Sequence, residues 1–363
     1  MNKFNKGIFC RAPYESVCIH ATGKLVPCSA FQPDTFDKNI NDNIFNFYNT
    51  PAYQEVRDSL EKGFYPKACI SCKKKDVLKL DLNRHRVNAE LQKTNVEPGK
   101  LKLLEISFSN TCNLACAMCS NRFSSKWNEH TKTAPQSILD LTEQKKVFTN
   151  TLTYKEIDEI LENSKDLLKV VIKGGEPLYD KKTLYYLENL VEINPNVNIR
   201  IVTNLTVYNE KLLKKFPNLI LSVSIDGLDD VYNYIRGFDF EIIKENFIKV
   251  SELNLKHVNI NYTTTAYNMH QILDTYLFFK NIYEEYNNLN KFSWTPLFAR
   301  NTYFYINNIS KNDYNKAKHR QASLINIPDY ISPNKKQIEN FKFYTNYIDN
   351  IRGFSWSDID KVY

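Results

Sequence analysis

The sequence predicts an α/β fold, namely a partial (β/α)6, TIM-like barrel preceded by a small α+β domain. The first observation is that apolar runs rich in β-branched residues alternate with helix-like stretches between residues 101 and 298. Strands that alternate with helices indicate βα units around a parallel sheet. The second observation is that the chain contains six such units, which suit an open barrel better than a closed eightfold one.

The strands and helices of the barrel follow from these runs. We expect strands over residues 103–110, 168–175, 198–205, 219–226, 257–265 and 292–298, and helices over residues 154–163, 182–193, 240–253 and 269–286. Polar or glycine-containing motifs stand at the ends of the first four strands: Cys112, Cys116 and Cys119; Gly174, Gly175, Glu176 and Pro177; Thr203 and Asn204; Ser224, Ile225, Asp226 and Gly227. Because binding and catalytic sites are built at this rim in βα architectures, we expect the functional site there.

The regions on either side of the barrel have a different character. Residues 1–80 are expected to form the small domain, with a hairpin over 16–28 that turns at Gly23 and a helix over 51–62. Residues 81–100 are expected to bridge this domain to the barrel, which covers 101–298. The polar and aromatic residues 299–363 predict a C-terminal helical segment of two or three helices that packs on the barrel.

Composition limits the classes of function. The net charge of +7 is modest for 363 residues, so we expect it to be mostly solvated surface and expect no nucleic-acid partner. No apolar run reaches the roughly 18 residues of a transmembrane helix. The first residues lack the apolar core of a secretory signal. These features predict a cytoplasmic protein with no membrane partner.

The eight cysteines are unusual for a cytoplasmic chain unless they bind metal or do chemistry. Five of them precede residue 73, and three form the spacing C-x3-C-x2-C directly after the first barrel strand. Three thiolates on one short loop can hold three irons of a four-iron cluster and leave the fourth iron open to a substrate or cosubstrate. Zinc binding, or no ligand at all, is the alternative for this triplet.

The motif CNLACAMC, with Met118 before the last cysteine, resembles the signature of the radical S-adenosylmethionine (SAM) superfamily. The other three rim motifs also resemble motifs of that family, in the expected order along the chain. Arg236 lies twelve residues after Ser224, which resembles a spacing in the peptide-modifying branch. The resemblance covers about residues 101–298 and implies a barrel of the radical SAM type.

The resemblance implies that the cysteine triplet holds a [4Fe-4S] cluster whose open iron binds SAM. It also implies that the glycine pair lies near the ammonium group of SAM, that Glu176 adds negative charge there, and that Ser224 and Arg236 hold the SAM carboxylate. The full set of implied SAM-binding residues is Met118, Gly174, Gly175, Glu176, Thr203, Asn204, Ser224, Asp226 and Arg236. An external one-electron donor such as flavodoxin or ferredoxin would allow SAM to be cleaved to a 5′-deoxyadenosyl radical, which abstracts hydrogen from the substrate.

Each rim motif also has a plainer interpretation. The Gly-Gly-Glu-Pro motif could be a simple strand-to-helix turn, and Asp226 could cap the helix that follows. Thr203 is an ordinary strand residue, and Arg236 could be a surface arginine. The motifs are specific to the radical SAM superfamily only when they are taken together, in their order along the chain.

A second set of four cysteines, Cys10, Cys28, Cys69 and Cys72, resembles the twitch module, a short relative of the SPASM domain that holds an auxiliary [4Fe-4S] cluster. That module usually follows the barrel, whereas here it precedes it. A four-cysteine zinc site is the alternative, because C-x2-C pairs suit tetrahedral zinc equally well.

The remaining cysteine, Cys18, lies on the predicted hairpin. A two-residue turn at Thr22 and Gly23 would place Cys18 opposite Pro27 and facing away from Cys28. Cys18 is therefore expected to be a small buried hydrophobe and not a ligand.

These assignments favour an oxidoreductase that acts on a peptide or a small molecule. Four protein ligands leave an auxiliary cluster no open iron, so we expect it to accept the electron left on the substrate radical. The reaction would then be the oxidation or cross-linking of a peptide, or the dehydrogenation of a sugar or cyclitol. An RNA-modifying radical SAM enzyme and a non-enzymatic zinc or iron–sulfur protein are the alternatives. The polar segment 121–153 is either part of the substrate site or a surface loop.

Overall fold

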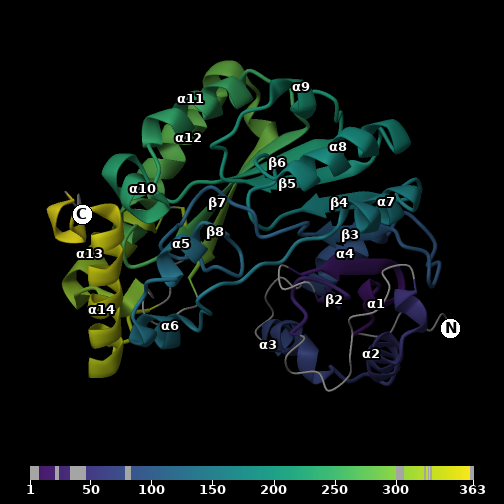
Figure 1. Ribbon diagram of the computed structural model, residues 1–363, viewed down its shortest axis with the longest axis horizontal. Helices are drawn as coiled ribbons and strands as arrows, with labels where there is room; N and C mark the ends of the chain where they lie inside the picture. The colour runs from purple at the N-terminus through teal and green to yellow at the C-terminus, as the bar shows by residue number, and fades with distance from the viewer. Residues whose placement is uncertain are drawn as a thin grey trace. The chain divides into compact units, whose positions relative to one another are not determined.

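The computed structural model describes residues 8–20, 24–32, 46–77, 83–299, 306–322, 324–325, 327 and 329–359, and its ribbon is drawn in Figure 1. It confirms the α/β class. Over these residues the strands form one eight-stranded sheet in the order β2-β1-β3-β4-β5-β6-β7-β8. The β1–β3, β3–β4, β6–β7 and β7–β8 pairs are parallel, and only the short β1–β2 pair among those described is antiparallel.

All six expected barrel strands are present. They are β3 (Leu103–Ile106), β4 (Lys169–Ile172), β5 (Asn198–Thr203), β6 (Leu219–Ser224), β7 (His257–Thr264) and β8 (Phe292–Phe298). The four expected helices are α7 (Tyr154–Glu162), α8 (Lys181–Ile193), α11 (Phe240–Ser251) and α12 (Ile272–Tyr286), the last preceded by a 3-10 turn at Met269–Gln271. Local chemistry explains their starts, because Thr153 and Glu156 form a capping box on α7 and Asp239 caps α11.

The expectation of six strands was incomplete. The segment β1 (Ser16–Ile19) pairs in parallel with β3, and β2 (Leu25–Val26) pairs with β1. The N-terminal residues therefore extend the sheet. The sequence of β1 fitted one arm of a hairpin, and a strand of four residues carries no local signal for its second neighbour.

The chain divides into two compact units, each built from several segments. Unit 1 comprises residues 1–109, 150–174 and 181–200, and unit 2 comprises 110–149, 175–180 and 201–363. The expected domain boundaries at residues 80, 100 and 298 stay a prediction. The division into two units gives unit 1 the strands β1 to β4 and unit 2 the strands β6 to β8, and β5 contributes residues to both.

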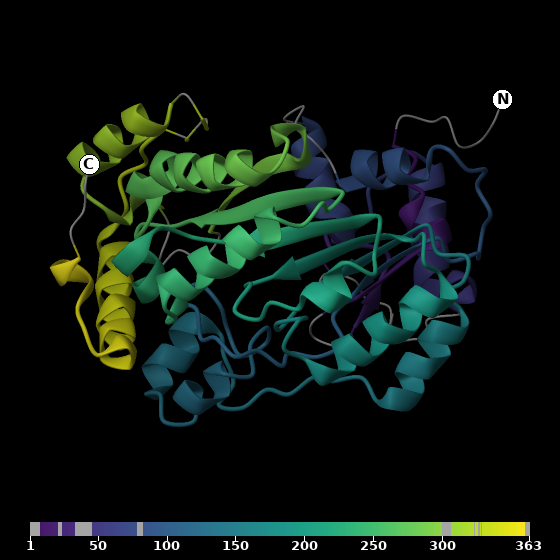
Figure 2. The same ribbon diagram turned by 90° about the horizontal axis from the view of Figure 1, so that it is seen from above.

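Unit 1 has one apolar sheet face and one polar sheet face. Val17, Leu104, Ile106, Val170 and Ile172 alternate along their strands and are fully buried. Helices α7 and α8 cover this face (Figure 2). The remaining helices of unit 1 are α1 (Ala12–Glu15), α2 (Pro51–Glu61), α3 (Ile70–Val77) and α4 (Asn83–Leu91).

The register of the N-terminal hairpin differs from the expected one. Cys18 pairs with Val26 and Ile19 pairs with Leu25, so Cys18 does not lie opposite Pro27. The expected turn at Thr22 and Gly23 lies outside the described residues. A shift of one residue reverses the face of a strand residue, and Cys18 accordingly shares an apolar cluster with Cys10, Cys28 and Cys69.

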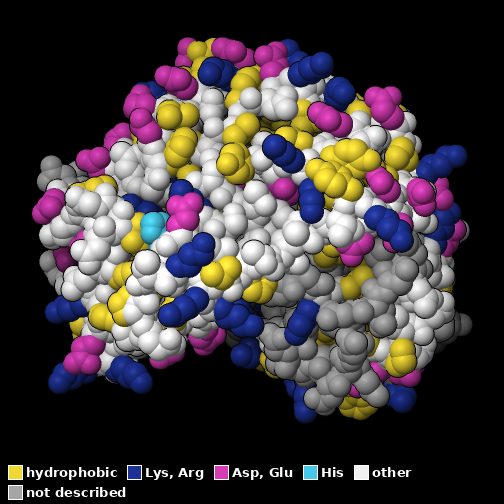
Figure 3. Space-filling view, in the orientation of Figure 1, with side chains coloured by type: hydrophobic (Ala, Val, Ile, Leu, Met, Phe, Trp, Pro, Cys, Tyr) yellow, Lys and Arg dark blue, Asp and Glu magenta, His cyan; other side chains and the backbone are white. Residues whose placement is uncertain are grey.

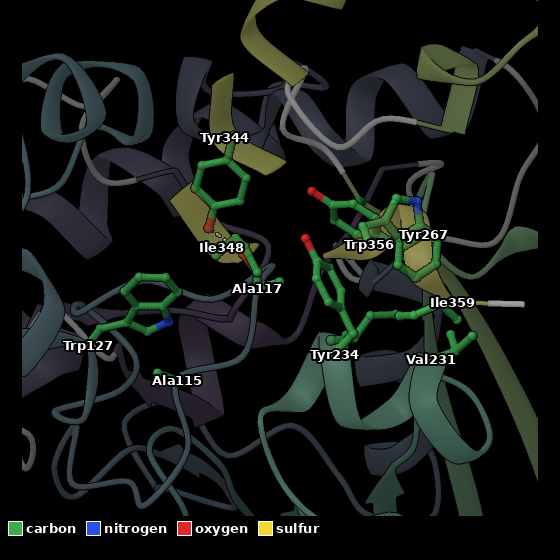
Figure 4. Packing of buried hydrophobic residues seen from close by; sticks show 12 residues of the cluster. Ala115, Ala117, Trp127, Val231, Tyr234, Tyr267, Tyr344, Ile348, Trp356 and Ile359 are labelled. Carbon is green, nitrogen blue, oxygen red and sulfur yellow. Dashed lines mark hydrogen bonds between the residues drawn. The ribbon is translucent and has the colours of Figure 1, made fainter. Parts of the chain in front are cut away.

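In unit 2 the C-terminal segment packs on the loop that carries the cysteine triplet. Helices α13 (Lys311–Gln321) and α14 (Lys335–Arg352) form most of this segment. Tyr344 and Ile348 of α14 join a buried cluster with Ala115 and Ala117 of the loop and with Tyr234 (Figure 4). Tyr234 belongs to α10 (Asp229–Arg236), which follows β6; α9 (Glu210–Leu213) follows β5.

Segment 121–153 contains two short helices, α5 (Trp127–Thr131) and α6 (Gln136–Thr142). Asn121 and Thr131 inside it are fully buried and are joined by hydrogen bonds within the segment. Lys and Arg side chains are interspersed with Asp and Glu over the face drawn in Figure 3. In the described part of the chain, no helix has the length and apolar character needed to cross a membrane.

Candidate functional site

The cysteine triplet lies on the loop after β3, and hydrogen bonds from several segments fix this loop. The Ala117 N–H donates to the Ile235 carbonyl of α10 at 2.7 Å. The indole N–H of Trp127 donates to the Cys116 carbonyl at 3.0 Å, and the Cys112 N–H donates to the hydroxyl of Ser125 at 3.1 Å. The three thiols therefore stand on a loop whose backbone is held in place.

Two of the predicted rim residues lie at the sulfurs. The guanidinium Nη1 of Arg236 is 3.6 Å from Cys116 Sγ, and the amide Nδ2 of Asn204 is 3.9 Å from Cys112 Sγ. These groups come from α10 and from the end of β5. The structure thus brings together three motifs that are separate in the sequence.

The glycine pair docks directly on the triplet loop. The Gly175 N–H donates to the Phe123 carbonyl at 3.1 Å, and the Glu176 N–H donates to the Thr111 carbonyl at 2.8 Å. Gly175 has φ +48°, and a Cβ there would lie 2.1 Å from the Thr111 oxygen. Only glycine fits this approach. In unit 1, a Cβ on Gly174 (φ +82°) would lie 2.4 Å from the Ser107 hydroxyl oxygen.

The carboxylate of Glu176 is buried and fully engaged. It accepts hydrogen bonds from the Thr203 hydroxyl at 2.6 Å, from the Asn204 N–H at 2.6 Å and from the Leu178 N–H at 3.0 Å. Burial raises the pKa of Glu176 to about 7, although these hydrogen bonds oppose the shift. Glu176 and Thr203 therefore tie the end of β5 to the Gly-Gly-Glu-Pro turn, and their expected role at SAM stays a prediction.

Asp226 and Arg236 form a buried ion pair. Asp226 also accepts a hydrogen bond from the Thr263 N–H at 2.6 Å, and its backbone carbonyl accepts one from the Asn268 amide at 2.9 Å. The N-cap of α10 is Leu228, so Asp226 is not the cap of that helix. Arg236 is 9% exposed, so it is not a surface arginine.

The other two predicted residues occupy less constrained positions. Ser224 is the last residue of β6 and is partly exposed. Met118 is partly buried and packs against the cluster that includes Tyr344.

The donor set at the triplet fits a cluster with SAM. The Nε of Arg236 and the hydroxyl of Tyr232 are buried and have no hydrogen-bond partner, so polar groups at the triplet remain to be satisfied. Burial raises the pKa of Cys112 to about 12, with a further contribution from Cys116. Thiols in such a place ionise when a metal supplies positive charge. Among the described residues no group of three or more His, Cys, Asp or Glu converges on one metal ion, and cluster ligands need not converge because each binds a different iron.

In unit 1 the second cysteine set lines one cavity of about 30 Å³. Cys10 precedes α1, Cys28 follows β2, Cys69 ends a 3-10 turn at Lys67–Cys69, and Cys72 lies in α3. Burial is the main cause that raises the pKa of Cys10, to about 12. The rest of the wall is mostly apolar, with Asn83 and Arg84 as its polar members.

One further polar group points to a ligand in that cavity. The amide nitrogen of Asn83, at the start of α4, is buried without a hydrogen-bond partner and lines the cavity. Burial is the main cause that raises the pKa of Cys28, which lines the same cavity. Cys18 is fully buried and does not line the cavity.

Sequence reasoning missed the residues that hold the triplet loop. Arg352 of α14 donates to the Ala115 carbonyl at 2.7 Å, and Tyr344 donates to the Ala117 carbonyl at 2.6 Å. Tyr232 was missed as well. Its place in "VYNYIRG", one helical turn before Arg236, was the signal that could have found it, because residues four apart share a helix face.

Comparison with known proteins finds a family match in the central part of the chain. Residues 106–279 match the family described as the Radical SAM superfamily. The GTP 3′,8-cyclase of Clostridium botulinum (strain Hall) is 26% identical over 168 residues, which are 45% of this chain and 47% of that protein. The probable GTP 3′,8-cyclase of Methanococcus aeolicus is 28% identical over 186 residues, 48% of this chain and 55% of that protein. The chain spans about half the length of the curated relatives it matches.

Solved structures with bound SAM are also similar. "Native anSMEcpe with bound AdoMet" is 17% identical with a TM-score of 0.42, over 70% of this chain and 63% of that chain. Streptococcus suis SuiB bound to S-adenosylmethionine is 18% identical with a TM-score of 0.41, over 82% of this chain and 67% of that chain.

Proposed function

We propose that this chain, whose residues 106–279 form a radical SAM domain, is a radical SAM enzyme. The observation that carries the proposal is the convergence of three segments on the cysteine triplet, with Arg236 at Cys116 and Asn204 at Cys112. A lone zinc site would not need a buried arginine whose charge is already paired with Asp226 and whose Nε still lacks a partner.

The chain's own residues divide the work at this site. Cys112, Cys116 and Cys119 would bind three irons of a [4Fe-4S] cluster, and the buried Nε of Arg236 offers a donor to the SAM carboxylate. The carbonyl groups of the glycine turn offer acceptors to the ammonium group. Bound together and reduced, the cluster and SAM supply a 5′-deoxyadenosyl radical that abstracts hydrogen from a substrate.

For the second cysteine set we propose an auxiliary [4Fe-4S] cluster held by four thiols, as in twitch and SPASM-like modules. The common cavity and the unpartnered amide of Asn83 support it. Such a cluster would accept an electron from the substrate radical, which favours oxidoreductase chemistry on a peptide, a sugar or a cyclitol. The names of the curated relatives add a nucleoside triphosphate to these candidates. The electron donor would be a flavodoxin or ferredoxin, and the location the cytoplasm.

Anaerobic purification tests the proposal. The wild-type protein should hold about eight irons, four per cluster, and release 5′-deoxyadenosine when dithionite and SAM are added. Cys116→Ala should contain about four fewer irons, since one cluster has lost a ligand. This variant should release no 5′-deoxyadenosine. Cys18→Ala is the matched control and should behave as wild type. Two zinc ions and no SAM cleavage would establish the non-enzymatic alternative instead.

A further inference from the structure

A closed ring of hydrogen bonds between three side chains lies beside Cys112. The Asn113 amide Nδ2 donates to the Thr206 hydroxyl at 2.8 Å, this hydroxyl donates to Asn204 Oδ1 at 2.7 Å, and Asn204 Nδ2 donates to Asn113 Oδ1 at 3.2 Å. Asn113 follows the first cysteine of the triplet, whereas Asn204 and Thr206 follow β5. All three belong to unit 2. The ring therefore joins the triplet loop to the end of β5.

One backbone group fixes the direction of every hydrogen bond in this ring. The Thr206 N–H lies 3.0 Å from the side chain of Asn204 and can only donate, so the atom that it meets must be the oxygen Oδ1. The Thr206 hydroxyl also donates to that oxygen, and it therefore accepts from the Asn113 amide. The NH2 group of Asn204 must then point the other way, toward the triplet loop.

The NH2 group of Asn204 has a second acceptor on that loop. Its Nδ2 is 3.9 Å from Cys112 Sγ, within hydrogen-bonding distance of a sulfur. One hydrogen of the group is donated to Asn113 Oδ1, so the other is left for the sulfur. Asn204 is buried, so little water competes for this second hydrogen.

The backbone after Asn204 is bent to make this arrangement. Leu205 has φ +58°, a left-handed conformation that residues other than glycine adopt only rarely. Its carbonyl accepts a hydrogen bond from the Asn246 amide of α11 at 3.0 Å, and its N–H donates to the Thr203 hydroxyl at 2.9 Å. These buried contacts hold the bend that returns the Thr206 N–H to Asn204. Strained backbone that is maintained by surrounding contacts is typical of functional sites.

We propose that Asn113 and Thr206 are positioning residues, which aim the amide of Asn204 at Cys112 and so raise the reduction potential of the [4Fe-4S] cluster proposed for the triplet. The inference rests on the proposed function, because it assigns a tuning role to residues around that cluster. An N–H directed at a cluster sulfur stabilises negative charge there. The cluster becomes more negative by one charge when it takes one electron from the external donor, so the hydrogen bond favours the reduced state.

A redox titration followed by electron paramagnetic resonance tests the inference. It uses the full-length chain with Cys69→Ala and Cys72→Ala, in which the triplet holds the remaining cluster. Adding Asn204→Ala removes the donor and should make reduction up to about tenfold less favourable, which lowers the reduction potential by up to about 59 mV for one electron. Asn113→Ala and Thr206→Val should each lower it by less, because the Thr206 N–H still holds Asn204 Oδ1.

Two further variants separate positioning from a merely structural role. Thr206→Ser keeps the hydroxyl and should keep the potential of the parent chain, whereas Thr206→Val should not. Thr133→Val removes an exposed hydroxyl elsewhere in unit 2 and should also leave the potential unchanged. Every variant should retain about four irons, one cluster, so that a changed potential does not reflect a lost cluster. Because valine has nearly the shape of threonine, the Thr206 pair keeps the test decisive if an alanine variant fails to fold.

Three results would overturn the inference. One is an unchanged reduction potential in Asn204→Ala, Asn113→Ala and Thr206→Val. Another is a potential in Thr206→Ser as low as that in Thr206→Val. The third is an unchanged potential together with a Kd for SAM that rises about tenfold in the Asn204 variant, measured by equilibrium dialysis, because Asn204 would then serve SAM and not the sulfur.

The same measurements distinguish failure of this inference from failure of the proposed function. If the parent chain shows no cluster signal, the proposed function fails and this inference fails with it. If the parent chain shows a signal whose g-values SAM shifts, and the ring variants keep its potential, only this inference fails. Should the parent chain not fold, the same titration is done in the wild-type background on the signal that SAM shifts.

Discussion

At the scale of single residues, Glu176 shows how the site is held together. Its carboxylate receives donors from Thr203, Asn204 and Leu178, so one side chain orders the end of β5 and the glycine turn. The sequence motif predicted that Glu176 adds negative charge near the ammonium group of SAM, which stays a prediction, and did not predict these hydrogen bonds. The hydrogen bonds depend on a side-chain orientation that the motif does not encode.

The raised pKa of Glu176 predicts a pH dependence of stability. Between the ordinary value of 4.5 and about 7 the native state keeps a proton that the unfolded chain has released. The free energy of unfolding should therefore fall as pH rises through this window. Thermal unfolding of the apo-protein against pH should show the slope, and Glu176→Gln should abolish it.

Glu176→Gln should also destabilise the protein at pH 8. The amide NH2 would replace one acceptor oxygen and face the N–H of Asn204, a loss of about 1–3 kcal/mol for a buried unsatisfied donor. Glu188→Gln, on the exposed side of α8, is the control and should leave the free energy of unfolding at pH 8 unchanged. A Glu176→Gln protein with the stability and pH profile of wild type would show that the carboxylate has no such role.

Arg236 supports a prediction about SAM affinity. Arg236→Lys keeps the positive charge beside Asp226 but removes the fork of donors, including the unpartnered Nε. We expect the Kd for SAM to rise about tenfold, with unchanged iron content. Arg122→Lys, an exposed position on the triplet side of unit 2, is the matched control. Equilibrium dialysis measures the Kd for SAM of both variants. If Arg236→Lys binds SAM as tightly as Arg122→Lys, Arg236 does not belong to the SAM site.

At the scale of elements, α14 buttresses the loop that carries the triplet. The hydroxyl of Tyr344 is buried and donates to the Ala117 carbonyl (Figure 4). Arg352 donates to the Ala115 carbonyl. A helix more than two hundred residues away in sequence therefore fixes the backbone between the cysteines of the triplet.

Tyr344→Phe tests this buttress. The Ala117 carbonyl would lose its donor, which costs about 1–3 kcal/mol when the group stays buried. We expect a lower melting temperature and faster removal of iron from the SAM cluster by a chelator. Tyr286→Phe on α12 removes a hydroxyl from a side chain that is 43% exposed and should alter neither property. Identical rates of iron loss in the two variants would mean that α14 does not stabilise the loop.

The six barrel strands and four helices could be predicted because each carries a local pattern. β-Branched runs mark β4 to β7, and Thr153 and Asp239 mark helix starts. The pairing of β1 with β3 could not be predicted, because SVCI fits a hairpin arm equally well. The predicted hairpin register was wrong by one residue for a related reason. Loop length sets the register, and the sequence leaves that length open.

At the scale of the whole molecule, the two cysteine sets belong to different units. The sequence separated them by position alone, and the four N-terminal cysteines that it grouped together line one cavity; their role as ligands stays a prediction. It did not reveal the ion pairs of Lys169 and Lys173, because both lysines stand in a run that reads as an ordinary strand. The ion pair of Lys169 with Glu90 arises only when α4 packs on the sheet.

The division into two cysteine sets predicts that one cluster can be lost while the other keeps its function. Cys69→Ala with Cys72→Ala should remove about four irons, one cluster, while SAM cleavage without substrate persists because the triplet is intact. Oxidation of the substrate should stop. Iron analysis and 5′-deoxyadenosine release measure the first two effects. Full turnover to the same product in this double variant would show that the auxiliary set carries no electron.

The most direct test of the central claim uses the same double variant, which retains only the cluster of Cys112, Cys116 and Cys119. Its electron paramagnetic resonance spectrum is recorded after reduction, with and without SAM. If the cluster has an open iron that SAM binds, SAM will shift the g-values of the signal. A cluster signal that is identical with and without saturating SAM would contradict the claim.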